Sequence, residues 1–215
     1  KEFLTLCSEI KSKKKGSNYY DCIIAVSGGK DSTYQTYLAT KIGGLNPLLL
    51  SFEPSWPTEI GKKNLDNLKN NFNTDLIQLK KNSQVYKKLA RIGFEIVGDH
   101  EWPNHVGIYT WPLKMAIKLN INLTLYGEPQ GLIGQGRVKK LKEIQTIDRN
   151  WFEEYVGMIG LRTSDMMEFD KSLSADDMFP YIFPEDSEIK DSKIVPIFTG
   201  NYFKWDSQEV TNLIE

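Results

Sequence analysis

The chain has 215 residues, of which 40% are hydrophobic, and its 27 basic and 28 acidic residues leave a formal net charge of −1. Such a balanced charge excludes a general electrostatic attraction to nucleic acids or acidic membranes. No apolar stretch approaches the roughly 18 residues of a membrane-spanning helix, and the two cysteines do not suggest a disulfide framework, so we expect a cytoplasmic protein.

The first half of the chain predicts alternating buried strands and helices. A short apolar run at 21–26 is typical of a strand in a parallel sheet, where both faces are covered. Similar runs predict three more strands, at 47–52, 75–79 and 121–128. The intervening sequence predicts helices at 33–44, at 58–72, around 85–92 and at 110–120, the last with Pro112 in its first turn. This order favours an α/β fold with a doubly wound, mostly parallel sheet.

The second half of the chain is less regular, so we expect helices and loops to elaborate the C-terminal third. The charged stretch at 136–160 has a helical pattern, whereas 176–193 is acidic and interrupted by prolines, which indicates a loop. A last strand is predicted at 194–198. The stretch at 206–214 begins with an Asp-x-x-Glu capping signal, which predicts a final helix.

The sequence "SGGKDS", which begins at Ser27, lies between the first predicted strand and the first predicted helix. Ligands of open α/β sheets bind beyond the carboxyl ends of the strands, which is where this loop must lie. Gly28 and Gly29 allow a tight turn and a close approach to a ligand. The hydroxyls of Ser27 and Ser32 and the ammonium of Lys30 add donors and charge. Together with backbone amides at a helix N-terminus, they predict a phosphate-binding loop.

Two common phosphate loops do not fit this stretch. A Walker A alignment places Ile24 at a required glycine and Asp31 at a required Ser or Thr, and the adjacent glycines fail the dinucleotide fingerprint. The stretch instead resembles the S-G-G-x-D-S/T signature of the PP-loop ATP pyrophosphatase superfamily. That resemblance implies an adenine nucleotide alpha hydrolase-like domain. Enzymes of this superfamily use ATP and Mg²⁺, transfer AMP to a carbonyl or amide oxygen, and release pyrophosphate.

The resemblance also implies which residues act on ATP. Lys30 occupies the variable position of the signature, and Asp31 orients the loop or Mg²⁺. Glu128 follows the fourth predicted strand, where a carboxylate could hold Mg²⁺ or accept a proton from ammonium. We therefore expect catalytic roles for Lys30, Asp31 and Glu128, with Asp31 and Glu128 as candidate Mg²⁺ ligands. The expected ATP contacts are Val26, Ser27, Gly28, Gly29, Lys30, Asp31, Ser32, Ser51, Phe52, Glu53 and Gly127.

Further stretches resemble the N-acetyl sugar amidotransferases of surface-polysaccharide biosynthesis, such as that of lipopolysaccharide O-antigen. They are "FEPSWPTEIGKKNLDNL", "GDHEWPNHVGIYTWPLKMAIK", "LYGEPQ" and "FTGNYFKWD", in the order found in that family. The resemblance implies that the N-acetyl group of a nucleotide-linked sugar becomes an acetamidino group. The ammonia then comes from a partner glutaminase subunit of the class-I amidotransferase type, because the chain shows no glutaminase motif of its own.

The resemblance further sets the expected segments of the chain. We expect a PP-loop ATP-binding domain at 19–136, an N-terminal helix or linker at 1–18, and a C-terminal extension at 137–215 that packs on the same domain. Members of the family usually carry a cysteine-rich segment before this domain and a longer region after it. We therefore expect this chain to be a fragment of a longer protein.

Two further groups of residues are candidates for contacts with the acceptor. Asn104 and His105 precede the fourth predicted strand, and Gln135 and Arg137 lie in the glycine-rich stretch "GLIGQGR". The histidines have no third ligand in the sequence, so we do not expect a zinc site. Cys22 lies within the first predicted strand and is expected in the core rather than as a catalytic thiolate.

Other functions remain open at this point. The PP-loop also occurs in other ligases and in tRNA-modifying enzymes. Binding of tRNA predicts a basic face, which the charge balance does not favour, so we expect no nucleic-acid partner. A regulator that binds ATP without cleaving it is a further alternative, against which the intact signature argues.

Overall fold

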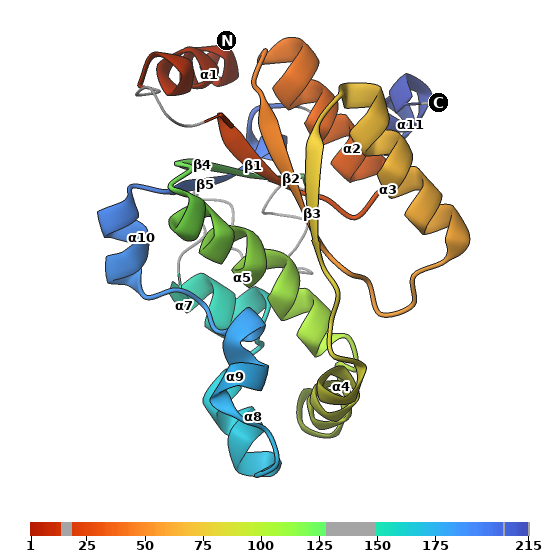
Figure 1. The fold of residues 1–215 in the computed structure, drawn as a ribbon, viewed down its shortest axis with the longest axis vertical. Coiled ribbons are helices and arrows are strands. Elements are labelled where there is room, and N and C mark those ends of the chain that lie inside the picture. The colour runs from red at the N-terminus through yellow and green to blue at the C-terminus, as the bar shows by residue number, and fades with distance from the viewer. Residues whose placement is uncertain (14–18, 128–148, 204, 215) are drawn as a thin grey trace.

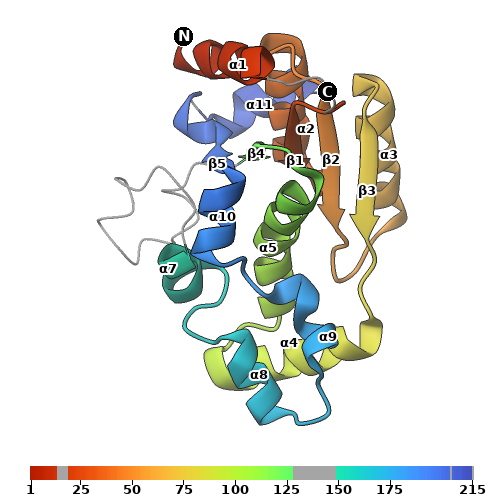
Figure 2. The ribbon, with the colours of Figure 1, turned by 60° about the vertical axis from the view of Figure 1, so that its left-hand side comes forward.

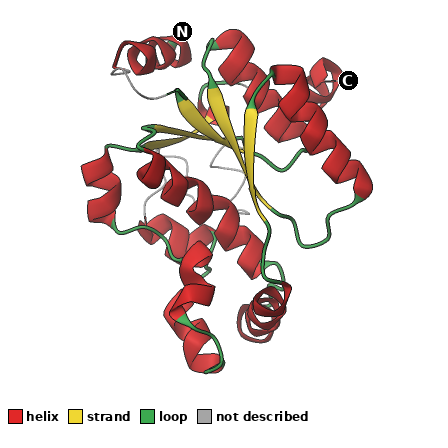
Figure 3. Cartoon of the chain, in the orientation of Figure 1, coloured by secondary structure: helices red, strands yellow, loops and turns green. Residues whose placement is uncertain are grey.

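The structure is a computed structural model that describes residues 1–13, 19–127, 149–203 and 205–214 (Figure 1). Its centre is a five-stranded sheet in the order β3-β2-β1-β4-β5, with helices on both faces (Figures 1 and 3). All strand pairs are parallel, so the expected doubly wound α/β fold is confirmed. The strands are β1 (Cys22–Ala25), β2 (Pro47–Phe52), β3 (Asp75–Leu79), β4 (Leu123–Tyr126) and β5 (Val195–Phe198).

Successive residues of the strands belong to two apolar cores, one on each face of the sheet. Ile23 packs into the core formed with α5 (Trp102–Leu119), whereas its neighbours Cys22 and Ile24 pack into the core formed with α3 (Glu59–Phe72). Adjacent strand residues point to opposite faces. Burial on both faces therefore explains why the strands read as continuous apolar runs in the sequence. Cys22 is 0% exposed, which confirms its expected place in the core.

The helices form a layer on each side of the sheet. The face that carries α3 also holds α1 (Glu2–Lys13), α2 (Lys30–Tyr37, continued by a π-helical turn at Leu38–Ile42) and α11 (Ser207–Ile214). On the other face, α5 contacts α4 (Ser83–Val97), a 3-10 turn at Phe179–Tyr181 and α10 (Asp186–Ser192). The short helices α8 (Thr163–Phe169) and α9 (Ala175–Met178) lie at the opposite end of the molecule from α1 (Figure 2).

The order of the strands reverses between β1 and β4. From β1 the chain passes through α2 to β2 on one side, whereas β4 and β5 lie on the other side. The first turns of the connections on either side of such a reversal diverge from each other and leave a crevice at the carboxyl ends of the strands. This crevice is the usual ligand site of a doubly wound sheet.

The helix expected at 110–120 starts earlier than predicted. It begins at Trp102, with Pro103 in its first turn, and Pro112 lies inside it. The prediction took the later proline as the helix start. Pro112 has no N–H for the carbonyl four residues before it, but the helix is held through this point by burial of its apolar face. Thr110 lies inside this helix, and its hydroxyl donates to the Pro180 carbonyl at 2.6 Å.

The expectation of a loop at 176–193 is also wrong. This stretch contains the end of α9, the 3-10 turn and α10. Ser174 and Asp177 cap the start of α9 reciprocally, and at the start of α10 the Glu185 amide donates to the Glu188 carboxylate at 2.8 Å. The prolines fall in the first turn of the 3-10 segment and just before α10, where a proline is tolerated.

The remaining expectations concern the last third of the chain. The described part of 136–160 contains the helical turn α7 (Arg149–Trp151) and a π-helical turn at Phe152–Val156. The expected final strand and final helix are β5 and α11, and Asp206 accepts hydrogen bonds from the amides of Gln208 and Glu209 as an N-cap does. The division into three segments stays a prediction. Across the described ranges, no helix is both long and apolar enough to cross a membrane.

Candidate functional site

The loop between β1 and α2 contains a glycine, Gly28, that lies directly against the backbone of α3. Gly28 adopts a φ of 82°, in the left-handed region that side chains rarely enter. A Cβ at this position would lie 3.0 Å from the Leu65 amide nitrogen and 3.2 Å from the Gly61 carbonyl oxygen. Both of these are backbone atoms of α3 and cannot rotate away. The path of the loop therefore requires glycine here.

Serine hydroxyls hold the loop in shape. The Ser32 hydroxyl accepts from the Gly28 amide at 3.1 Å and donates to the Gly29 carbonyl at 2.9 Å. The Ser27 hydroxyl accepts from the Gly29 amide at 3.4 Å. The loop leads into the first turn of α2, whose amides have no partners within the helix and carry its positive end. Hydroxyls, amides and helix end thus form a surface suited to an anion.

Asp31 joins the loop to a residue far along the chain. Its Oδ1 accepts from the Lys30 ammonium at 2.6 Å and from the Trp205 indole N–H at 2.9 Å, although Trp205 lies 174 positions away. The Trp205 ring also packs edge-on against Tyr34, with 5.0 Å between ring centroids. The Trp205 hydrogen bond fixes the orientation of the loop carboxylate.

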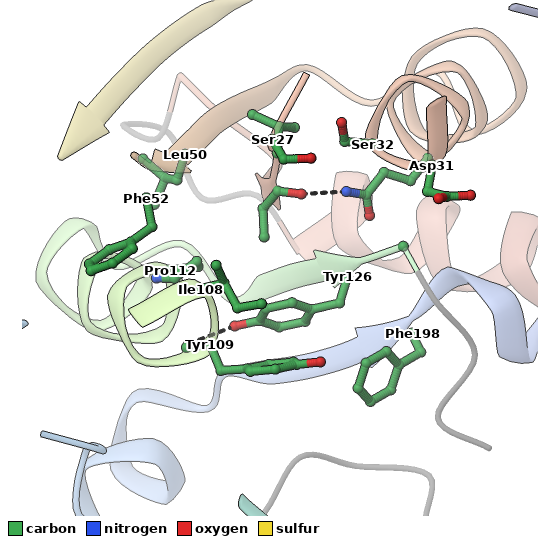
Figure 4. Close-up of a pocket in the computed structure, with 14 residues that line it drawn as sticks. Ser27, Asp31, Ser32, Leu50, Phe52, Ile108, Tyr109, Pro112, Tyr126 and Phe198 are labelled. Carbon is green, nitrogen blue, oxygen red and sulfur yellow. Dashed lines mark hydrogen bonds between the residues drawn. The ribbon is translucent and has the colours of Figure 1, made fainter. Parts of the chain in front are cut away.

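A pocket of about 170 Å³ opens at the strand-order reversal (Figure 4). Its polar side comes from the loop and from α2, and its apolar side comes from the ends of β2 and β4 and from α5. Six of the expected ATP contacts line it: Val26, Ser27, Asp31, Ser32, Phe52 and Gly127. The other lining residues are Ala25, Gln35, Leu50, Ile108, Tyr109, Pro112, Tyr126 and Phe198.

Phe52 and Tyr126 give this pocket fixed walls. The Tyr126 hydroxyl donates to the Tyr109 carbonyl at 2.9 Å (Figure 4). The Phe52 ring lies against Gly107 on α5, where any Cβ would overlap it. Because Phe52 is buried and backed by α5, it holds the apolar side of the pocket in place.

Gln35 is a site residue that the sequence interpretation missed. Its side chain is 1% exposed and lines the pocket, and its amide nitrogen donates to the Ala25 carbonyl. That bond fixes which end of the amide is the oxygen, and Oε1 has no hydrogen-bond partner among the described residues. A buried acceptor without a donor is costly, so a ligand with an N–H or O–H group would satisfy it. The available signal was a polar residue one turn after Ser32 on the helix face that points inward.

A second pocket, of about 260 Å³, lies at the carboxyl ends of β2 and β3. Glu101 is fixed within it, because its carboxylate accepts from the Ser55 hydroxyl at 2.7 Å, the Asn104 amide at 2.9 Å and the Tyr86 hydroxyl at 3.2 Å. The Ser55 and Tyr86 hydroxyl oxygens also lie next to each other, but each hydroxyl has one proton, so neither donates to the other while both donate to Glu101. Glu53 lines this second pocket rather than the first.

Lys81 is the more buried of the two lysines that line the second pocket. Its ammonium lies 4.0 Å from the centre of the Tyr86 ring and 5.2 Å from that of Phe52, and it donates to the Asn104 side-chain oxygen at 3.0 Å. Burial lowers the pKa of Lys81 to about 8, while Glu101 and Glu53 act in the opposite direction. Lys81 therefore changes charge close to neutral pH.

Replacing Lys81 by methionine is expected to change how stability depends on pH. The pKa of about 8 in the fold lies below the value of about 10.4 in an unfolded chain. The unfolded state therefore binds more protons between these values, and the cost of burying the charge is fully present below pH 8 and disappears as the pH rises through 10. Relative to the native chain, the variant should gain stability as the pH falls from about 10 to about 7.

Urea unfolding of both proteins across this range measures the effect, and Lys87→Met is the matched control because Lys87 is an exposed lysine that lines the same pocket. A stability difference between Lys81→Met and the native chain that stays constant with pH would contradict the prediction.

The other predicted site residues are placed as follows. Asn104 bridges Lys81 and Glu101 beside the second pocket. His105 lines neither pocket, because its ring bonds to Asp99 at 2.7 Å. The side chain of Ser51 is buried without a hydrogen-bond partner among the described residues and lines neither pocket. Glu128, Gln135 and Arg137 lie outside the described residues.

The described residues do not form a dedicated metal cage. No cluster of three or more His, Cys, Asp or Glu side chains that could hold a metal ion occurs in this part of the chain. Magnesium, however, is usually bound by one or two carboxylates together with phosphate oxygens of the substrate. Asp31, where the loop between β1 and α2 joins the helix, fits that arrangement.

Comparisons with known proteins give a limited likeness. No family model matches the chain, and no curated protein matches it. Among solved structures, NMN synthetase from Francisella tularensis aligns over 89% of this chain and 90% of its own, with 11% identity and a TM-score of 0.46. The U34-tRNA thiolase NcsA from Methanococcus maripaludis aligns over 98% of this chain and 72% of its own, with 13% identity and a TM-score of 0.37.

Proposed function

We propose that this protein is an ATP-dependent enzyme of the PP-loop type that transfers AMP to an amide oxygen of its acceptor. The observation that carries the proposal is the position of "SGGKDS". This sequence occupies the turn from β1 into α2, at the strand-order reversal, and its side chains form the polar side of the first pocket. Signature, topology and cavity thus support the same site.

In this proposal the loop holds the pyrophosphate part of ATP. Gly28 and Gly29 let the backbone approach the phosphates, and the hydroxyls of Ser27 and Ser32 exchange their internal hydrogen bonds for phosphate oxygens. Lys30 balances the charge that develops as pyrophosphate departs. The apolar wall that Phe52 helps to form receives the adenine.

The roles of the acidic residues follow from charge. Mg²⁺ bound with ATP would neutralise phosphate charge, with Asp31 and Glu128 as its proposed protein ligands. One oxygen of Asp31 is engaged by Lys30 and Trp205, and Oδ2 makes no hydrogen bond to a described residue. Asp31 is therefore held in place through Oδ1, which leaves Oδ2 for the proposed bond to Mg²⁺.

For the acceptor we propose the N-acetyl group of a nucleotide-linked sugar, supported by the family resemblance of the flanking stretches. AMP transfer to the amide oxygen turns that oxygen into part of a good leaving group. Ammonia from a glutaminase partner then attacks the amide carbon, AMP departs with the oxygen, and an acetamidino group remains. Asn104, His105, Gln135 and Arg137 are the proposed acceptor contacts, and Glu128 is the proposed base for ammonium.

Incubation of the protein with ATP, Mg²⁺, ammonium and UDP-N-acetylglucosamine tests the proposal. AMP and pyrophosphate should appear in equal amounts, and mass spectrometry should detect the acetamidino sugar. Ser27→Ala should lose this activity, whereas Ser164→Ala, at an exposed serine of α8, should keep it. Formation of ADP would contradict the proposal. Formation of AMP with tRNA, but not with any sugar, would show that the acceptor is tRNA and not a sugar.

A further inference from the structure

The second pocket is built from helix α4 and from three segments that meet at the carboxyl ends of β2 and β3. One follows β2 and carries Glu53, Ser55 and Trp56, the second joins β3 to α4 and carries Lys81, and the third precedes α5 and carries Glu101. The pocket adjoins the first one through Phe52, which lines the first pocket while its ring centre lies 5.2 Å from the Lys81 ammonium.

We propose that this second pocket binds the pyranose ring of the acceptor sugar, with Trp56 as the stacking surface and Lys81, Glu53 and Glu101 as hydrogen-bonding groups. This inference rests on the proposed function, because it assigns a place to the acceptor of that reaction. It also makes a separate claim about binding, which holds or fails without ATP.

Trp56 provides an apolar surface at the mouth of the pocket. Its side chain is 81% exposed, the largest exposed fraction among the large hydrophobic side chains of the described residues. Covering an exposed indole with another apolar surface removes both from water and lowers the free energy. A pyranose ring presents such a face through its C–H groups, so stacking on Trp56 would shield both from water.

The polar groups of the pocket include both donors and acceptors. The Lys81 ammonium has three N–H bonds and makes one hydrogen bond to the described residues, to Asn104, which leaves donors for a ligand oxygen. The carboxylates of Glu53 and Glu101 accept but do not donate. A hydroxyl group does both and can therefore bond to either type of neighbour. The pocket thus suits a ligand with several hydroxyls on one rigid ring.

The balance of charge distinguishes a sugar ring from an anion. The pocket is lined by two basic side chains, Lys81 and Lys87, and by two acidic ones, Glu53 and Glu101. A phosphate would meet two carboxylates as well as the lysines, which costs it much of the attraction. A neutral polyol avoids that repulsion. The rigid placement of Glu101 by its three donors further limits the loss of side-chain freedom on binding.

Saturation-transfer NMR titration with methyl N-acetyl-β-glucosaminide, without ATP, tests the inference on the whole chain. We expect binding, and we expect Trp56→Ala to weaken it by about tenfold, the effect of losing one aromatic contact. Phe169→Ala is the matched control, because it removes an aromatic side chain that is 56% exposed and outside both pockets. Trp56→Ala should fold normally, since it truncates a surface residue, and circular dichroism checks this.

Tyr86→Phe provides a second variant. It removes the hydroxyl that donates to Glu101 and keeps the ring beside Lys81, so sugar affinity should fall while the fold is retained. Unchanged sugar affinity in both variants would overturn the inference. So would binding of UDP alone that depends on Trp56, because the pocket would then select an anion.

The two proposals fail in different ways. If AMP and pyrophosphate form but sugar affinity does not depend on Trp56, the reaction stands and the second pocket is not its sugar site. If the sugar binds at Trp56 while ATP is never cleaved, the pocket is confirmed as a sugar site and the proposed reaction is wrong.

Discussion

Replacing Gly28 by alanine is expected to slow ATP cleavage strongly and to destabilise the fold. The positive φ costs a side chain about 1–2 kcal/mol. The contact of the new Cβ with the α3 backbone at 3.0 Å adds an overpacking cost of about 1–3 kcal/mol. Relief of that contact moves the loop away from α3 and takes its amides out of position. Turnover should fall by about 10²–10³-fold, as when preorganised donors are lost.

Gly98→Ala separates backbone strain from displacement of the loop. Gly98 has a φ of 74°, close to that of Gly28, but a Cβ there would meet nothing within 4 Å. Its variant should lose a similar amount of stability from strain and keep ATP affinity. Calorimetric titration with ATP and urea unfolding measure the two effects. Equal ATP affinity in both variants would show that the loop is not the nucleotide site.

Replacing Asp31 by asparagine is expected to lower turnover by about a hundredfold with little change in stability. Asparagine has the same shape and keeps an oxygen for the Trp205 indole N–H, so the connection to Trp205 survives. It loses the negative charge that would bind Mg²⁺. The variant should therefore need more Mg²⁺ for half-maximal rate, which a magnesium titration of pyrophosphate release measures.

A variant of Trp205 separates the effect of the orientation of Asp31 from the effect of its charge. Trp205→Phe removes the indole N–H, keeps an aromatic ring beside Tyr34 and leaves the charge in place. It should lower the maximal rate without changing the Mg²⁺ requirement. Asp66→Asn, at an exposed carboxylate of α3, is the matched control. An unchanged Mg²⁺ requirement in Asp31→Asn would show that Asp31 only positions the loop.

The features that local sequence determines were predictable. The strands are buried on both faces, so each reads as an apolar run, and all five expected strands are present. The turn from β1 into α2 at "SGGKDS" was also predictable, because its glycines and hydroxyls are needed for its own path, whereas its binding of phosphate stays a prediction. The backbone of Gly28 and the hydroxyl of Ser32 show this directly.

The features that depend on tertiary contacts were not predictable. The start of α5 was misplaced because two prolines, Pro103 and Pro112, each resemble a first-turn residue, and only burial of the whole apolar face favours the earlier one. Gln35 is an ordinary helix residue until the Ala25 carbonyl orients its amide. Lys81 and Glu101 belong to different segments and meet only when β3 and α5 are in place.

The hydrogen bond from Trp205 to Asp31 has a consequence for biosynthesis. During translation Asp31 leaves the ribosome 174 residues before the indole that fixes its carboxylate. Domains fold as they emerge, so the sheet can begin to assemble while this carboxylate still lacks its indole donor. A nascent polypeptide that has not yet reached Trp205 therefore contains the whole loop but lacks the donor that orients the Asp31 carboxylate.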